Sequence, residues 1–258
     1  MDDKDRPIGV FDSGVGGVSV LRELVRLLPG ERFLYYADTA NAPYGTKTRE
    51  QVAELSLKIA RFLIEDRQAK ALVVACNTAT SAAVRLLREK FAVPIVGMEP
   101  ALKPAVARAH GKTVLVMATP MTLREEKFQS LIARYGQGAS IISLPCPGLV
   151  ELIEAGKTEG PEMHAYLREI FASVDTSQVG VVVLGCTHYI FARRAIAAFF
   201  SADTPVIDGN EGTARQLKRV LEMNGLRNAG APAVPEPVEW FTSGSPEALE
   251  KLRAFWRK

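Results

Sequence analysis

Short, uninterrupted apolar runs alternate along this chain with longer stretches in which apolar residues recur at helical spacing. Apolar runs that are rich in β-branched residues and lack alternation are typical of strands buried on both faces of a parallel sheet. They predict strands at residues 8–11, 32–37, 71–75, 95–96, 113–118, 140–144, 179–184, 205–207 and 238–241. Because helical stretches separate these runs, we expect an α/β fold built from βαβ units.

The intervening stretches carry apolar residues on one face and charged residues on the other, the pattern of a helix that covers a sheet. They predict helices at residues 18–28, 50–65, 79–89, 123–135, 161–173, 191–200, 212–224 and 247–256.

Several landmarks recur along the chain with a spacing of roughly 110 residues, which indicates an internal duplication. Cys76 and Cys186 each follow an apolar run and precede a polar, helix-starting segment. Asp12 and Thr119 each end an earlier apolar run at a similar spacing. We therefore expect one α/β unit used twice, with a cysteine at the same structural position in each copy.

We expect the first domain to comprise residues 1–98 and 208–258, and the second to comprise residues 99–207. The last predicted strand and helix follow the completed second repeat, so the C-terminal stretch should return and pack on the first domain.

Composition narrows the class of protein. The 258 residues are 47% hydrophobic and 24% charged, as in an ordinary globular protein. The formal charge of +3, without a dense basic cluster, argues against a nucleic-acid partner. No apolar run approaches the ~18 residues of a membrane span, and the N-terminus lacks a signal-peptide pattern. Three cysteines without framework spacing favour a reducing cytoplasm.

Polar residues gather where the predicted strands end. In parallel sheets, ligands bind at the carboxyl ends of strands, close to the free N–H groups of the next helix. Four segments fall there: Asp12-Ser13-Gly14, Cys76-Asn77-Thr78, Thr119 with Thr122, and Cys186-Thr187-His188. Their hydroxyl, amide and backbone groups suit the carboxylates and ammonium of a small polar substrate.

The paired cysteines point to proton transfer. A thiol at a helix N-terminus has a lowered pKa, because the helix dipole favours the thiolate. Asp12 is placed to orient or deprotonate Cys76, and His188 stands in the same relation to Cys186. If one thiolate removes a proton from a carbon atom and the other thiol supplies one from the opposite face, the configuration of that carbon is inverted.

Two other sites are compatible with some of these residues. Gly14-x-Gly16-Gly17, followed by an acidic residue at Asp38, partly matches a dinucleotide-binding fingerprint, but Ser19 replaces the third glycine. Asp38 fits a turn cap as well as a site residue. In a nucleotide- or ligand-binding protein of this kind, the cysteines would be structural.

A metal site built from Cys76, Cys186 and His188 is the other alternative. It would offer only three ligands and no CxxC pair. The third cysteine, Cys146, has no partner motif and is expected to be a packed loop residue.

Five ordered segments resemble the glutamate racemases of the cofactor-independent aspartate/glutamate racemase superfamily. They are IGVFDSGVGG, ADTANAPYG, ACNTAT, ATPMT and LGCTHY, and the similarity runs from about residue 8 to about residue 213. The resemblance implies two α/β domains related by a pseudo-two-fold axis, with the active site in the cleft between them. A sibling racemase acting on aspartate or another amino acid is the nearest alternative.

The resemblance also implies an activity. It is the interconversion of L- and D-glutamate without pyridoxal phosphate or metal, supplying D-glutamate for peptidoglycan in the cytoplasm. The expected partner is the small-molecule substrate, and the expected assembly is a homodimer.

Residue roles follow from the same resemblance. Cys76 and Cys186 correspond to the catalytic thiols that act on the D- and L-enantiomers, assisted by Asp12 and His188 respectively. Glu151, in the Leu-Val-Glu segment, corresponds to a carboxylate that acts with His188, and Glu154, one helical turn further on, is the alternative. Substrate contacts are expected from Asp12, Ser13, Tyr44, Gly45, Asn77, Thr78, Thr119, Thr122, Thr187 and His188.

Overall fold

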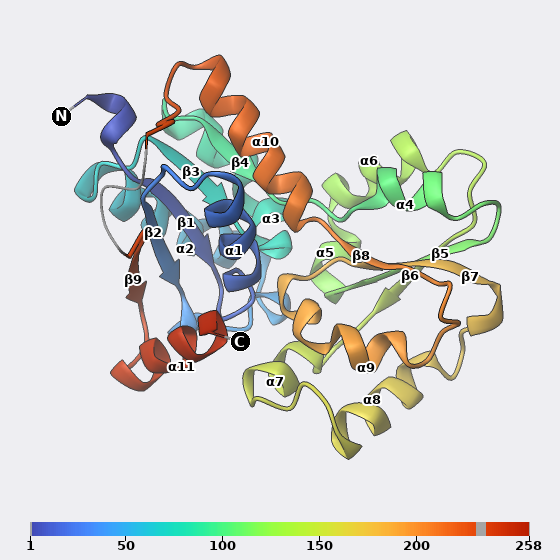
Figure 1. Ribbon diagram of the computed structural model, residues 1–258. Coiled ribbons are helices and arrows are strands. Elements are labelled where there is room, and N and C mark those ends of the chain that lie inside the picture. The colour runs from blue at the N-terminus through green and yellow to red at the C-terminus, as the bar shows by residue number, and fades with distance from the viewer. Residues whose placement is uncertain (1, 231–235, 258) are drawn as a thin grey trace. The chain divides into compact units, whose positions relative to one another are not determined.

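The computed structural model describes residues 2–230 and 236–257 of the chain (Figure 1). The chain forms two units. Unit 1 comprises Met1–Met98 and Asn210–Lys258, and unit 2 comprises Glu99–Gly209. Among the described residues, no helix is both long enough and apolar enough to cross a membrane.

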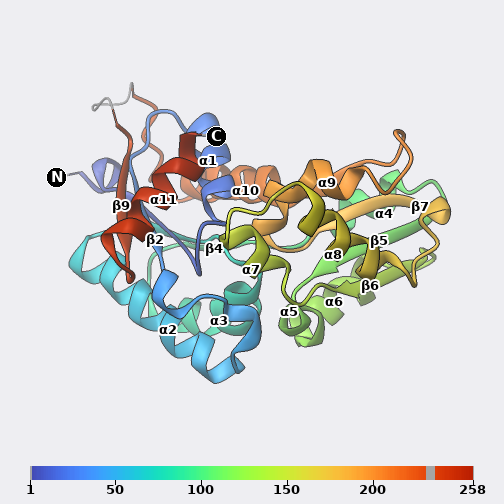
Figure 2. The same ribbon diagram turned by 90° about the horizontal axis from the view of Figure 1, so that it is seen from below.

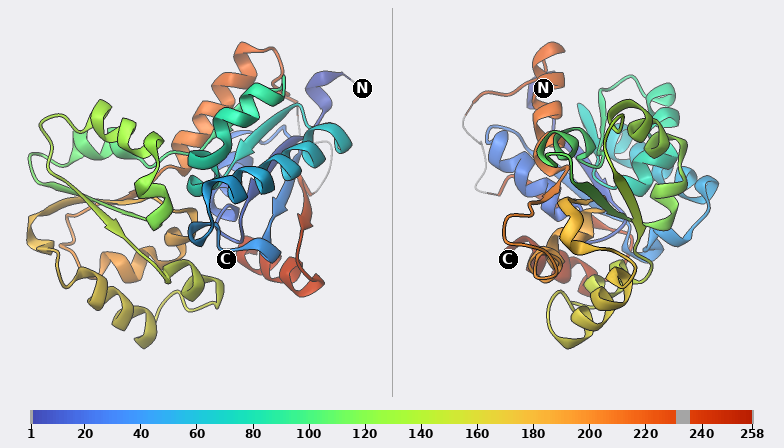
Figure 3. Two further views of the ribbon diagram at one scale, coloured as in Figure 1. Left: turned by 180° about the vertical axis from the view of Figure 1, so that it is seen from behind. Right: turned by 90° about the vertical axis from the view of Figure 1, so that its right-hand side faces the viewer.

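Unit 1 is built on a parallel five-stranded sheet in the order β4-β3-β1-β2-β9. Its strands are β1 (Ile8–Asp12), β2 (Phe33–Ala37), β3 (Ala71–Val74), β4 (Ile95–Gly97) and β9 (Val238–Thr242). The central strands β1 and β3 are buried along their whole length, as their uninterrupted apolar runs predict. The C-terminal strand β9 lies beside β2 at the edge of this sheet (Figure 3).

Unit 2 is built on a parallel four-stranded sheet in the order β6-β5-β7-β8. Its strands are β5 (Thr113–Ala118), β6 (Ile141–Pro145), β7 (Val179–Leu184) and β8 (Val206–Asp208). Taken in chain order, they have the same neighbours as β1 to β4 of unit 1. The predicted α/β fold and its internal duplication are therefore confirmed at the level of strand order.

The strand β6 departs from the expected burial. Because it lies at the edge of its sheet, one side of it reaches the surface, and Ile142 is 38% exposed. The prediction that every apolar run is buried on both faces is thus wrong for β6, and equally for the edge strands β8 and β9, most of whose residues are only partly buried. An edge strand and a central strand of a parallel sheet have similar apolar composition, and only the pairing distinguishes them.

Helices cover both faces of the unit 1 sheet (Figure 2). On one face lie α1 (Val18–Leu27), α10 (Asn210–Met223) and α11 (Pro246–Arg257), with α1 in contact with the other two. On the other lie α2 (Arg49–Arg61), continued by the π-helical turn η4 (Phe62–Asp66), and α3 (Asn77–Lys90). Helix α3 begins two residues before the predicted start, directly after Cys76.

Helices also cover both faces of the unit 2 sheet. Alternate side chains of β5 and β7 point to opposite faces, so Leu115 and Met117 enter one apolar cluster while Val114 and Val116 enter another. The first cluster includes residues from α7 (Leu149–Glu154), α8 (Pro161–Phe171), the 3-10 helix η6 (Thr187–Ala192) and α9 (Arg193–Ala197). The second includes residues from α4 (Leu102–Arg108) and α6 (Glu126–Tyr135).

Two helical predictions in unit 2 need correction, and two short helices are additional. The single helix expected at 123–135 is two helices, α5 (Pro120–Arg124) and α6, because Glu125 has an extended backbone and interrupts the helical hydrogen bonding. The helix expected at 191–200 begins earlier as η6 and ends as α9. The short helices α4 and α7 were not predicted, since one or two turns give too little periodicity to recognise.

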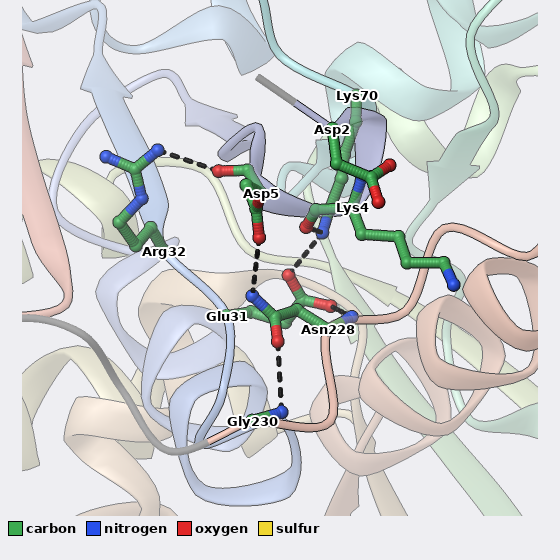
Figure 4. Close-up of polar contacts among 8 residues, drawn as sticks. All are labelled: Asp2, Lys4, Asp5, Glu31, Arg32, Lys70, Asn228 and Gly230. Atoms are coloured by element: carbon green, nitrogen blue, oxygen red, sulfur yellow. Dashed lines mark hydrogen bonds and ion pairs between the residues drawn. The ribbon is translucent and has the colours of Figure 1, made fainter.

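A buried ion pair joins four segments of unit 1 at the end of the sheet where β2 and β3 begin (Figure 4). Lys70 Nζ donates to Glu31 Oε2 at 2.5 Å, and both side chains are 1% exposed. Lys70 Nζ also donates to the carbonyl oxygen of Lys4, and Glu31 Oε1 accepts from the backbone N–H of Asn228 at 2.8 Å. Through these hydrogen bonds, the ion pair connects the sheet to the N-terminal segment and to the segment that follows α10.

Replacing Lys70 with methionine is expected to lower the free energy of unfolding by about 3–5 kcal/mol, because Glu31 would be left as an uncompensated buried charge. Lys58→Met is the matched control. It removes an exposed pair with Glu54 on α2 and should leave stability nearly unchanged. Urea unfolding followed by circular dichroism measures both variants. Equal stability of the two variants would contradict this role for the buried pair.

Candidate active site

The predicted site residues divide between the two units and take equivalent positions in each. Asp12 ends β1, and Cys76 stands between β3 and α3. In unit 2, Thr119 follows β5 and Cys186 stands between β7 and η6. Because β1 pairs with β3 and β5 pairs with β7, each cysteine lies beside the end of a neighbouring strand. We call these groups the Cys76 site and the Cys186 site.

In the Cys76 site, the thiol is the N-cap of a long helix. Cys76 Sγ accepts the backbone N–H of Ala79 at 3.4 Å and lies 3.9 Å from Ser13 Oγ. The side chain is 5% exposed. A sulfur atom that accepts a helix N-terminal N–H is stabilised as the thiolate. The geometry therefore suits Cys76 to act as a base.

Asp12 is fully buried beside this thiol segment. Its Oδ1 atom accepts the backbone N–H of Gly14 at 2.7 Å, which fixes the carboxylate at the end of β1. A Cβ atom at Gly17 would lie 2.5 Å from the Asp12 Cβ, so only glycine fits there. The glycines after β1 thus make room for the carboxylate at the strand end.

Asn77 and Thr78 form the first turn of α3 and are buried. The Oδ1 atom of Asn77 accepts no hydrogen bond from any described residue. A buried carbonyl oxygen without a donor is costly. This atom is therefore available to accept a hydrogen bond from a substrate ammonium group.

The Tyr44-Gly45 turn, a short 3-10 helix (η3, Tyr44–Thr46), completes the Cys76 site. The Tyr44 hydroxyl donates to Asp38 Oδ2 at 2.5 Å. Burial raises the pKa of Tyr44 well above its usual range, and the negative charge of Asp38 raises it further. Charges at Cys76 and Asp12 raise this pKa too, so Tyr44 is a neutral phenol, and η3 contacts α3, the helix that begins directly after Cys76.

In the Cys186 site, a histidine rather than a helix N–H accompanies the sulfur. Cys186 begins the 3-10 helix η6 without capping it, and its Sγ lies 3.9 Å from His188 Nδ1. The other ring nitrogen, Nε2, lies 2.8 Å from Glu154 Oε1. A carboxylate only accepts hydrogen bonds, so Nε2 carries the proton and Nδ1 faces the thiol as an acceptor. The imidazole is thus oriented to take the Cys186 proton.

The carboxylate that contacts His188 is Glu154 and not Glu151. Glu154 is half-buried on α7, whereas Glu151 is exposed one turn earlier and acts electrostatically on Tyr166 and Tyr189. The contact with His188 is thus made by the alternative residue, Glu154, and the catalytic role of either carboxylate stays a prediction. Both lie on α7 three residues apart, so helical spacing alone did not separate them.

The remaining predicted residues of unit 2 lie at the ends of β5 and β7. Thr119 caps α5 by accepting the N–H of Thr122 at 3.2 Å, and the hydroxyl oxygens of the two threonines are 2.9 Å apart. Thr187 is buried in the first turn of η6. Cys146 is buried in the loop before α7, as predicted, and burial raises the pKa of its thiol.

Among the described residues, no three His, Cys, Asp or Glu side chains gather closely enough to hold a metal ion. Asp38, which the dinucleotide fingerprint would direct to a ribose, instead binds Tyr44.

The comparisons with known proteins agree with one another. A sequence model described as Asp/Glu/Hydantoin racemase matches residues 8–217. The glutamate racemase of Clostridium botulinum (strain Alaska E43) is 51% identical over 229 residues, which cover 88% of each chain.

Two solved structures are similar along nearly the whole chain. The glutamate racemase of Francisella tularensis, solved with D-glutamate, has a TM-score of 0.85 and 29% identity, covering 99% of this chain and 95% of that one. The Escherichia coli glutamate racemase, solved with L-glutamate and the activator UDP-MurNAc-ala, has a TM-score of 0.83 and 32% identity, covering 97% and 95%. The chain therefore belongs to the Asp/Glu/hydantoin racemase family and is an isomerase.

Proposed function

We propose that this protein is a glutamate racemase that works by cofactor-independent, two-base proton transfer between Cys76 and Cys186. The observation that carries the proposal is the recurrence of a thiol at the same point of two units with the same strand order. Glutamate as substrate is supported by the curated relative at 51% identity and by the structural relatives solved with D- and L-glutamate.

In the proposed reaction, the Cys76 thiolate removes the Cα proton of D-glutamate, and the Cys186 thiol protonates the opposite face to give L-glutamate. Each turnover then leaves Cys76 as the thiol and Cys186 as the thiolate, so the enzyme is ready for the reverse reaction. Exchange of these protons with water restores the starting state. The two enantiomers have equal energy, so the enzyme must catalyse both directions, which is why a base is required on each side.

The two thiols are supported differently in the proposed mechanism. The N–H of Ala79 at the start of α3 stabilises the Cys76 thiolate. In the L-to-D direction, His188 accepts the proton of Cys186 and becomes an imidazolium that Glu154 stabilises, and in the D-to-L direction that proton stays on the thiol. Backbone and hydroxyl donors near Ser13, Thr78, Thr119 and Thr187 are the proposed contacts of the substrate carboxylates, and the acceptor Asn77 Oδ1 is the proposed contact of its ammonium group. Exclusion of water around the substrate would strengthen all of these interactions.

The proposal extends to the biological role that the resemblance implies. D-Glutamate would be supplied for peptidoglycan in the cytoplasm, by a homodimer.

Cys76→Ser and Cys186→Ser are each expected to lower racemisation by about 10²–10⁴-fold, because a serine hydroxyl is a far weaker acid than a thiol and supplies almost no anion to act as the base near neutral pH. Racemisation is measured as the change in optical rotation, from each enantiomer. Cys146→Ala is the matched control and should keep activity within a few-fold, and circular dichroism checks all three folds. Near-normal turnover of either serine variant would rule out the two-base mechanism.

Glu154→Gln is expected to slow racemisation at least about tenfold, because the neutral amide no longer stabilises the His188 imidazolium. The alkylation rate of Cys186 by iodoacetamide should fall with it, while that of Cys76 in the same molecule stays unchanged. Glu151→Gln should have the smaller effect on both quantities. A larger loss in Glu151→Gln than in Glu154→Gln would reverse the assignment.

A further inference from the structure

The buried carboxylate of Asp38 gathers three hydrogen-bond donors from different parts of unit 1. Oδ2 accepts the Tyr44 hydroxyl at 2.5 Å. Oδ1 accepts Asn41 Nδ2 at 2.9 Å and Ser243 Oγ at 2.6 Å. Asp38 is 2% exposed, and within the described residues no cation pairs with it. The Asp38 carboxylate therefore interacts with neutral hydrogen-bond donors, which it orients.

Asp38 is more than a turn cap. It is the N-cap residue of the 3-10 helix η2 (Thr39–Asn41), yet its side chain accepts no capping N–H from that helix. A carboxylate that only started the turn would bind the free backbone N–H groups. Instead it accepts the hydroxyl of Tyr44 on η3, and η3 contacts α3, the helix that begins directly after Cys76.

The third donor comes from the far end of the sequence. Ser243 directly follows β9, whose last residue, Thr242, pairs with Ala37 at the end of β2. The backbone N–H of Ser243 donates to Ala37 O at 3.2 Å, and its hydroxyl also accepts the N–H of Ala40 at 3.1 Å. Ser243 lies outside residues 8–217, the part matched by the racemase family model. The C-terminal strand thus places the Ser243 hydroxyl against the Asp38 carboxylate, which in turn binds Tyr44.

We propose that Asp38 is a positioning residue that fixes the Tyr44-Gly45 turn of the Cys76 site, and that Ser243 of the C-terminal strand holds Asp38 in place. The inference rests on the proposed function, because it assigns the turn to the glutamate site of Cys76. Asp38 and Ser243 act through Tyr44 and touch neither the substrate nor the thiol in this account.

A double-mutant cycle tests the connection between Asp38 and Tyr44. Asp38→Asn and Tyr44→Phe should each lower kcat/KM for glutamate by about tenfold or more, since a displaced contact of about 1 Å is enough to cost up to ~10²-fold. If Asp38 acts through Tyr44, the double variant loses no more than the worse single variant. Losses that multiply would show that the two residues act independently and would overturn the proposal.

Three variants at the end of β9 test the part played by Ser243. Ser243→Ala should lower kcat/KM by at least about threefold, and Ser243→Thr should restore it, because the hydroxyl returns and the exposed position accommodates a methyl group. Thr242→Val is the matched control. It removes the hydroxyl that pairs with Thr39 and accepts the N–H of Gly244 at the same strand end, leaves the Ser243–Asp38 hydrogen bond in place, and should behave as wild type. Equal activity of Ser243→Ala and Thr242→Val would overturn the role of Ser243.

Amide hydrogen exchange separates this inference from the proposed function. Exchange in residues 39–47 should rise in Asp38→Asn and Ser243→Ala but not in Thr242→Val, with residues 187–197 of unit 2 as the internal reference. If the wild-type protein did not racemise glutamate, the proposed function would be overturned. The exchange data would still test whether Asp38 and Ser243 fix the Tyr44-Gly45 turn. Unchanged exchange in both variants would overturn the positioning even in an active racemase.

Discussion

The rest of the structure depends on the geometry of parallel β-sheets, which brings the carboxyl ends of neighbouring strands to one edge. Asp12 and Cys76 lie at the same edge of the sheet because β1 and β3 are paired and parallel. Thr119 and Cys186 lie at the same edge of the other sheet because β5 and β7 are paired and parallel. Helices on both faces bury these central strands, so their ends are rigid supports for reactive side chains. Because the arrangement occurs twice, it places one thiol at the end of a central strand in each unit.

The two thiol sites share a position but not a set of neighbours. Cys76 receives an N–H from an α-helix, whereas Cys186 starts a 3-10 helix that offers no such bond to its sulfur. His188 and Glu154 take the place of the missing N–H. Each site also uses a carboxylate to orient its proton-bearing neighbour, Asp38 for Tyr44 and Glu154 for His188. The two units therefore share their strand order, while the helix after each thiol and the contacts that support the thiol differ.

The sequence predicts the strands and the positions of Cys76 and Cys186 well, because both depend on local signals. Each strand is a short apolar run, and both cysteines stand at the ends of such runs. The break at Glu125 was missed, since the helical pattern continues through a residue whose backbone is extended. The choice between Glu151 and Glu154 was not decided by spacing, because both lie on α7 and only the packing of α7 against η6 brings one of them to His188. The bond between Asp38 and Ser243 joins residues that no local pattern connects.

The central claim is that two thiols exchange a proton at one carbon atom of glutamate. Incubation of L- and D-glutamate with the protein in deuterated buffer, without added cofactor and followed by NMR, measures loss of the Cα proton together with the configuration of the product. The account predicts that each enantiomer gains deuterium at Cα as it is converted to the other, and that aspartate does not react. Exchange with aspartate alone would contradict the substrate, and exchange with neither amino acid would contradict the two-thiol mechanism.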